Sequence, residues 1–109
     1  MLVHEMLNTL AQIQTLVDGE ARDQFLVDKA KPHALAMFFV ILGEAASKVS
    51  KSLQAEHPDV PWQRVANLRH LIAHEYRRID HDQLWAMAAK DAPQLRSGLP
   101  VPPPSDQFD

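Results

Sequence analysis

Residues 32–53 of the chain read PHALAMFFVILGEAASKVSKSL, a stretch in which apolar residues recur every three or four positions. This spacing predicts a helix whose apolar stripe is formed by Leu35, Phe38, Leu42, Ala45, Ala46, Val49 and Leu53. A second stripe, Met37, Val40 and Ile41, makes the first half of the helix apolar nearly all round. Such a helix is buried on more than one side, and in a small bundle the second side suggests a partner chain.

Helical periodicity also precedes this core helix. Apolar residues at helical spacing over 2–17 predict one helix, which ends at Asp18-Gly19 with Gly19 as a left-handed cap. A shorter helical segment covers about 25–30, and Pro32 suits the first turn of the core helix because its missing N–H does no harm there.

Two further helices follow the core helix. Pro61 opens one that runs to about residue 78, and Asp80 is a good N-cap for the next, which Pro93 ends or renews. No alternating strand pattern extends beyond a few residues. The sequence therefore predicts an all-α, up-and-down bundle of four main helices plus a short extra helix.

The length and composition of the chain limit the functions that it can have. A chain of 109 residues makes one domain, which we place at 1–98, followed by a Pro-rich, extended or disordered tail at 99–109. The absence of cysteine excludes disulfides and thiol catalysis, and neither Gly-rich phosphate-loop motif occurs. No secretory signal or membrane span is visible, so we expect a cytoplasmic protein without membrane association.

The segment WQRVANLRHLIAHEYRR, residues 62–78, concentrates the groups that can do chemistry. The formal net charge of the whole chain is −3, but this segment has four arginines against one glutamate, a local charge of +3. On a helix, His70 and His74 share a face, and Arg69 lies nearly in line with Tyr76. Arginine matches phosphate oxygens, and histidine moves protons near neutral pH, which together suggest metal-free cleavage of a phosphodiester such as RNA.

Simpler interpretations exist for each of these residues. An Arg and a His five apart are more often a surface cation and a structural histidine, and Tyr76 is by default a bundle tyrosine. His70 and His74 could bind a metal as an i, i+4 pair, but no third ligand is evident, so we expect neither metal nor cofactor. Glu44 could be a buried acid paired with Lys48 or with an arginine of the next helix.

Several motifs together resemble the HepT-like proteins of the HEPN superfamily. Arg69, His74 and Tyr76 form the R-x4-H-x-Y pattern, in which His70 replaces a residue that is frequently Asn. The family's "GEA" core segment resembles residues 43–45, its entry to the motif helix resembles 61–62, and its D-x4-W pattern begins at Asp80. The matches run from about Leu2 to about Leu95 in the family's order.

The resemblance implies an all-helical homodimer in which the motif helices of two protomers meet in a shared cleft. It implies the toxin of a type VII-like toxin–antitoxin pair, a metal-independent endoribonuclease whose partner is an MNT-type nucleotidyltransferase. That partner would attach AMP to Tyr76 and silence the toxin.

We assign the site residues on this basis. Arg69 and His74 are the candidate catalytic pair, and His70 and Glu44 are supporting residues. RNA phosphate would be bound by the remaining arginines of the segment, Arg64, Arg77 and Arg78. The alternative is a non-catalytic dimeric module that partners the nucleotidyltransferase and serves mainly as its AMP acceptor.

Overall fold

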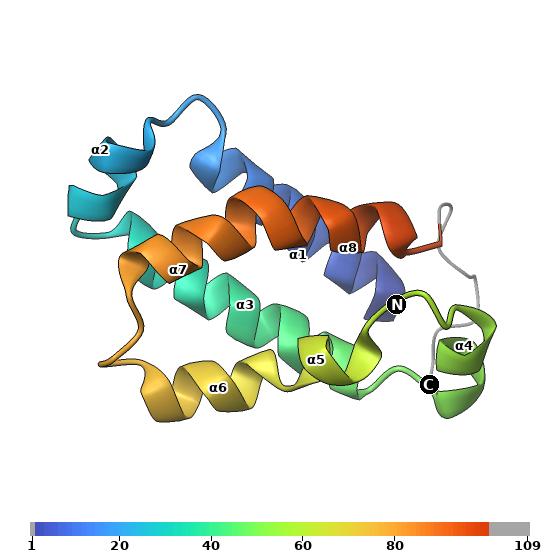
Figure 1. Ribbon diagram of the computed structural model, residues 1–109. Coiled ribbons are helices and arrows are strands. Elements are labelled where there is room, and N and C mark those ends of the chain that lie inside the picture. The colour runs from blue at the N-terminus through green and yellow to red at the C-terminus, as the bar shows by residue number, and fades with distance from the viewer. Residues whose placement is uncertain (1, 101–109) are drawn as a thin grey trace.

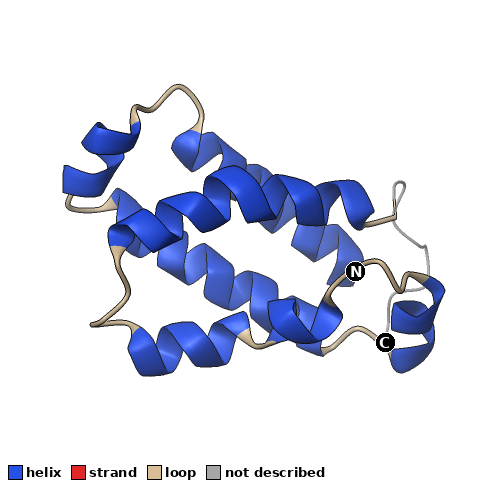
Figure 2. Cartoon of the chain, viewed as in Figure 1, coloured by secondary structure: helices blue, strands red, loops and turns tan. Residues whose placement is uncertain are grey.

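The structure is a computed structural model that describes residues 2–100 (Figures 1 and 2). Within this range the chain forms helices and no strand. The elements are α1 (Leu2–Val17), α2 (Arg22–Val27), α3 (Lys31–Ser47), α4 (Lys51–Glu56), α5 (Trp62–Ala66), α6 (Leu68–Glu75), α7 (His81–Ala86), η1 (Met87–Asp91) and α8 (Ala92–Gly98). The prediction of an all-α bundle is confirmed.

Helix α3 is the centre of the bundle. It packs against α1 on one side and against α5 and α6 on the other, while α7, η1 and α8 run as one rod that reaches both α1 and α3 (Figure 1). The short α2 bridges α3 and α7 at one end. Four main rods and a short extra helix therefore match the predicted architecture of the described residues, with α4 as an additional turn.

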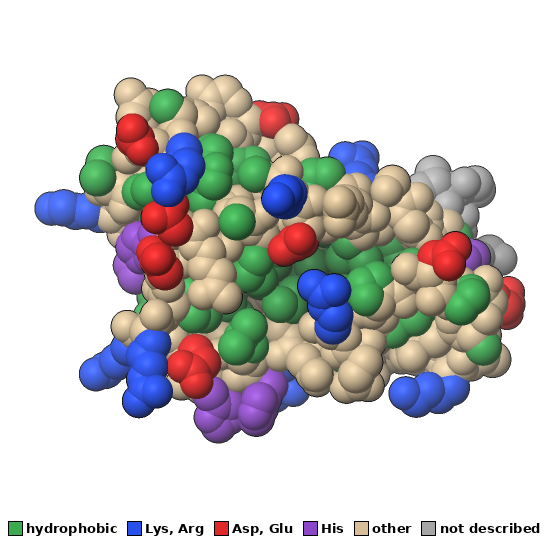
Figure 3. Space-filling model, viewed as in Figure 1, with side chains coloured by type: hydrophobic (Ala, Val, Ile, Leu, Met, Phe, Trp, Pro, Cys, Tyr) green, Lys and Arg blue, Asp and Glu red, His purple; other side chains and the backbone are tan. Residues whose placement is uncertain are grey.

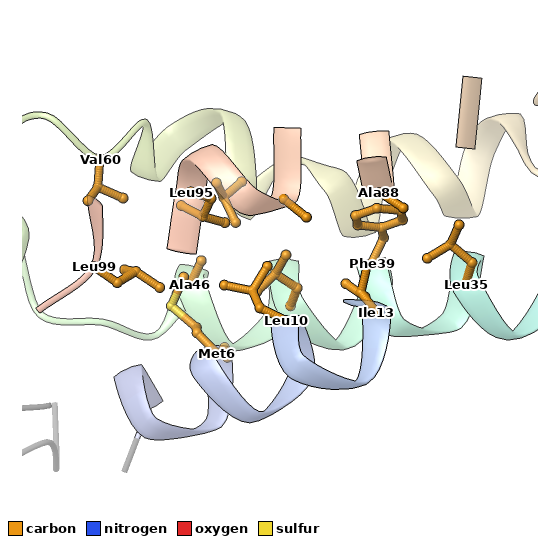
Figure 4. Close-up of a cluster of buried hydrophobic side chains, with 14 of the residues drawn as sticks. Met6, Leu10, Ile13, Leu35, Phe39, Ala46, Val60, Ala88, Leu95 and Leu99 are labelled. Carbon is orange, nitrogen blue, oxygen red and sulfur yellow. The ribbon is translucent and has the colours of Figure 1, made fainter. Parts of the chain in front are cut away.

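The core lies between these rods. Figure 4 shows Met6, Leu10 and Ile13 of α1 pointing toward side chains of α3 and α8, with Phe39 and Leu95 among them. The main stripe predicted for α3 has one error, because Phe39 is 2% exposed and lies in the core, whereas Phe38 is only partly buried. The burial predicted for the second stripe is wrong within this chain, since Met37 and Ile41 are exposed. Leu99 also packs in the core, one residue beyond the domain boundary expected at 98, whereas residues 101–109 of the expected tail lie outside the described range.

The first two loops are closed by local hydrogen bonds. Gly19 has φ +70°, the left-handed cap that the sequence predicts. Asp28 accepts hydrogen bonds from the backbone N–H groups of Ala30 and Lys31 at 2.7 and 2.8 Å, and these bonds lower the pKa of its carboxyl. An ion pair of 2.7 Å between Glu20 and Lys31 raises the pKa of the lysine. Together these contacts fix the start of α3.

The single helix predicted over 32–53 is wrong in its second half. Helix α3 ends at Ser47, because the N–H groups of Lys48 and Val49 bond three residues back, to Ala45 and Ala46. Ser50 then caps α4 by accepting a hydrogen bond from the N–H of Leu53 at 3.2 Å. The apolar stripe continues through the break, so its spacing did not reveal it.

The helix predicted from Pro61 to residue 78 is also divided. It breaks at Asn67 into α5 and α6, and α6 ends at Glu75. The final rod, by contrast, continues through Pro93. Asp80 caps α7 as predicted, accepting from the N–H of Asp82 at 3.0 Å, and the π-helical turn η1 directly precedes the proline. Pro93 therefore renews the helix as α8, since the wider turn accommodates its missing N–H.

Gly43 sets how closely α3 approaches the junction of α5 and α6. A Cβ atom built on this residue would lie 2.8 Å from the backbone N of Arg69 and 2.9 Å from the backbone O of Val65. Both neighbours are main-chain atoms, which cannot rotate away as a side chain can. The close contact therefore requires glycine, and it places the next residue of α3, Glu44, beside α6.

We expect Gly43→Ala to lower the free energy of unfolding by about 1–3 kcal/mol, because the methyl group must push two helices apart. Urea denaturation measures this change. Gly98→Ala is the matched control, since a Cβ there meets only a methyl group of Val60 at 3.5 Å. Equal stability of the two variants would contradict the close-contact assignment.

Candidate active site on helix α6

The break at Asn67 gives α6 its own direction along α3. Helix α6 buries Ile72 against the core, which turns the other faces of this short helix outward. Arg69, His70 and His74 are all exposed on it. The residues that the sequence singles out therefore lie at the surface rather than in the core, where they can meet a ligand.

Glu44 connects α3 to the motif arginine. Its carboxylate lies 3.0 Å from Nη1 of Arg69 and 3.2 Å from Nζ of Lys48. Both alternatives for Glu44, pairing with Lys48 and pairing with an arginine of the next helix, are therefore realised at once. The side chain of Arg69 is 61% exposed and that of Glu44 40% exposed, so the pair is hydrated and can be exchanged for another anion.

The two histidines of α6 form a pair on one face of the helix, as their spacing predicts. The centroids of the His70 and His74 rings are 4.1 Å apart, and the ring planes are tilted by 44°. Figure 3 shows histidine side chains gathered along the outer edge of α6, with basic side chains at the end of the helix. The pair is accessible to water and to a substrate.

A shallow hollow of about 450 Å³ opens where α6 ends. It is lined by Ala73, His74, Tyr76, Arg77 and Arg78. The end of α6 thus brings one imidazole, a phenol and two guanidinium groups around a common space. An anion such as a phosphate would find two fixed positive charges there.

Tyr76 is in contact with α3 as well as with this hollow. Its hydroxyl oxygen lies within hydrogen-bonding reach of Nδ1 of His33, in the first turn of α3, and the two ring centroids are 5.6 Å apart. On the other side of His33, the ring of His81 lies edge-on at 6.1 Å. Sequence reasoning missed His33 and His81. The signal for His33 was its position eleven residues before Glu44, which puts both on one face of α3.

Arg69 and Tyr76 are nearly in line on α6, yet each contacts α3 at its own place. Their partners Glu44 and His33 are eleven residues apart, about 16 Å along the helix axis. The exposed side chains of Met37 and Ile41 lie between them on α3. One chain therefore presents the guanidinium of Arg69 beside Glu44 and the phenol of Tyr76 beside His33, with Met37 and Ile41 between the two places.

Arg64 is not part of this cluster. It lines a separate groove of about 670 Å³ between α5–α6 and η1–α8, whose apolar members include Phe39, Leu68, Leu71 and Met87. Figure 3 shows this groove as the hollowed apolar area in the middle of the view. Of the arginines expected to bind RNA, the structure brings Arg77 and Arg78 to His74 and leaves Arg64 with the apolar groove.

Within residues 2–100, no group of three or more His, Asp or Glu side chains is arranged to hold a metal ion. No helix in the described part combines the length and apolarity needed to cross a lipid bilayer.

Because the Glu44–Arg69 pair is hydrated, we expect Glu44→Gln to change the free energy of unfolding by about 1 kcal/mol or less. The measurement is urea denaturation beside Gly43→Ala, the neighbouring substitution with the larger expected effect. A loss above about 2 kcal/mol would mean that Glu44 supports the fold rather than the site.

The chain is similar to proteins of one known family. The family described as "Ribonuclease HepT-like" matches residues 6–100. "Probable ribonuclease HepT" of Thermococcus cleftensis is 28% identical over 96 residues, which cover 84% of this chain and 87% of that protein. "Putative RNase MJ1380" of Methanocaldococcus jannaschii is 27% identical over 79 residues, 72% of each chain. No solved structure matches. The chain therefore belongs to the HepT-like ribonuclease family, and ribonuclease is the class of enzyme that this membership assigns to it.

Proposed function

We propose that the protein is a metal-independent endoribonuclease and that Arg69 and His74 carry the reaction. The observation that supports this most directly is the exposed cluster on α6. His74 shares a hollow with two arginines, and Arg69 stands on the same helix with only a hydrated carboxylate as its partner. An RNA phosphate can displace that carboxylate, because a bidentate arginine–phosphate contact is stronger than a hydrated surface ion pair.

The reaction needs only groups that RNA and this chain supply. His74 accepts the proton of the 2′-hydroxyl, and the 2′-oxygen attacks the adjacent phosphorus. The bond to the 5′-oxygen breaks, which leaves a 2′,3′-cyclic phosphate and a free 5′-hydroxyl after that oxygen takes up a proton. Arg69 holds the phosphate and offsets the charge that develops on its oxygens in the transition state. His70 orients the phosphate or tunes its neighbour His74.

A homodimer would complete the cleft. Arg69 and His74 are five residues apart on α6, about 140° around the helix, so one chain does not aim both at a single phosphate. A two-fold axis would let each protomer supply one of the two groups. The unpartnered side chains of Met37 and Ile41, 57% and 37% exposed, lie beside Glu44 and give such a dimer an apolar contact.

Tyr76 is the residue at which we propose that the enzyme is controlled. We place the protein as the toxin of a type VII-like toxin–antitoxin pair, with an MNT-type nucleotidyltransferase that transfers AMP to Tyr76. Tyr76 is 45% exposed and borders the hollow of His74, Arg77 and Arg78. An AMP group there would bring a negative charge to the arginines and repel RNA phosphate.

We expect Arg69→Ala and His74→Ala each to reduce cleavage of an RNA substrate by about 100-fold or more in the presence of EDTA. The assay follows cyclic-phosphate ends by gel electrophoresis. Arg96→Ala is the matched control, because Arg96 is an exposed arginine on α8, outside both the hollow and the motif. Cleavage by either motif variant at the rate of the unaltered protein would exclude this mechanism.

The second candidate is a dimeric module with little catalysis of its own that serves as the AMP acceptor. The exposure of Tyr76 and its contact with His33 favour an accessible acceptor. With ATP and the cognate nucleotidyltransferase, we expect intact-mass measurement to show AMP on the unaltered protein and none on Tyr76→Phe. AMP addition without any RNA cleavage would favour this second candidate, and cleavage without AMP addition would exclude it.

A further inference from the structure

His33 is the histidine whose position the ribonuclease site leaves unexplained. It projects from the first turn of α3, outside the R-x4-H motif, and its Nδ1 faces the hydroxyl of Tyr76. Both side chains are exposed, so their contact is not imposed by packing in the core. Tyr76 is also the single tyrosine of the chain, which makes its chemistry separately measurable.

A tyrosine needs help to act as a nucleophile. An unperturbed phenol has a pKa of about 10, so only about one molecule in a thousand is ionised at pH 7. A neutral imidazole nitrogen that accepts a hydrogen bond from the hydroxyl can take up its proton during the attack. The phenol then need not be ionised beforehand, as in other activated hydroxyl nucleophiles.

His74 is less suited to this task. His74 and Tyr76 line the same hollow, but the ring of His74 lies against that of His70, with the two centroids 4.1 Å apart. His33 is thus the imidazole with its nitrogen at the phenol oxygen.

We propose that His33 is the general base that activates Tyr76 for nucleotidyl transfer, an inference that rests on the proposed AMP modification of this residue. The Tyr76 oxygen attacks the α-phosphorus of ATP, and a new oxygen–phosphorus bond forms. The bond from that phosphorus to the bridging oxygen breaks, and pyrophosphate leaves. The hydroxyl proton passes to Nδ1 of His33. The acceptor therefore contributes its own base.

The surroundings of His33 keep the ring in place. The ring of His81, from α7, packs edge-on against it at 82° between the ring planes. Nδ1 of His81 lies 3.4 Å from the backbone oxygen of Leu26. Arg77 and Arg78 line the same hollow as Tyr76 and bring two fixed positive charges to it.

The test uses N-acetylimidazole on the full chain, without the partner enzyme. Acetyl groups on the tyrosine oxygen are counted by intact mass as those that hydroxylamine releases, and Tyr76→Phe defines the background. We compare the unaltered protein with His33→Gln, which keeps a hydrogen-bond acceptor but takes up no proton. His81→Gln is the matched control, since His81 contacts His33 but not the phenol. Rates are followed between about pH 5.5 and 8.5, the range in which imidazoles titrate.

We expect His33→Gln to acetylate Tyr76 about 10-fold or more slowly at pH 7, with a rate that keeps rising with pH as the free phenol ionises. The unaltered protein and His81→Gln should both show the faster rate, which levels off above the pH range in which imidazoles titrate. Circular dichroism and the urea midpoint report whether each variant is folded. A folded His33→Gln protein with an unchanged rate and pH profile overturns the proposal.

The variant His33→Gln also tells whether the role of His33 as a base is wrong or the AMP modification of Tyr76 is wrong. In the assay with ATP and the nucleotidyltransferase, AMP addition to His33→Gln at the unaltered rate overturns the role of His33 and supports Tyr76 as acceptor. Loss of acetylation in His33→Gln, with no AMP added to the unaltered protein, supports the base and excludes the AMP modification.

Discussion

At Gly43, helix α3 comes so close to the α5–α6 junction that a single methyl group would lie 2.8 Å from the backbone of Arg69. This approach fixes the distance between the central helix and the helix that carries the motif. It also explains why Glu44, the next residue, reaches the guanidinium of Arg69 at 3.0 Å. A steric constraint in the backbone thus positions an electrostatic contact at the surface.

The site is formed by residues of two helices, α6 and α3. Helix α6 supplies Arg69 and His74, and Tyr76 follows directly after its last residue. Helix α3 supplies a partner to two of these residues, Glu44 for the arginine and His33 for the tyrosine. The exposed histidine pair is left without a partner from α3. Because the ion pair is hydrated, the guanidinium of Arg69 stays accessible to an anion from solvent.

The net charge of the chain is negative, but its positive charges are concentrated in one segment, where an anionic substrate can bind. The whole chain has a formal charge of −3, but four of its six arginines lie between 64 and 78. The structure brings two of them, Arg77 and Arg78, to the hollow beside His74. One focused positive site of this kind suits a specific phosphodiester contact better than nonspecific coating of a nucleic acid.

The sequence by itself determined the helical class, the order of the main helices, the left-handed turn at Gly19 and the cap at Asp80. These features depend on local spacing and on the conformational preferences of single residues. It also identified the motif segment, because residue type and spacing on one helix are local properties. The same periodicity marked a second apolar stripe on α3, but the structure leaves its residues Met37 and Ile41 exposed rather than buried.

Only the tertiary structure decided where the long helices break and which side chains meet. The apolar stripe runs unbroken past Ser47, and helix-forming residues surround Asn67, so neither break has a local signal. The pairing of His33 with Tyr76 joins residues 43 positions apart. Such a contact depends on the relative direction and register of two packed helices. Gly43, where the backbone of α3 closely approaches that of Val65 and Arg69, helps to set that register.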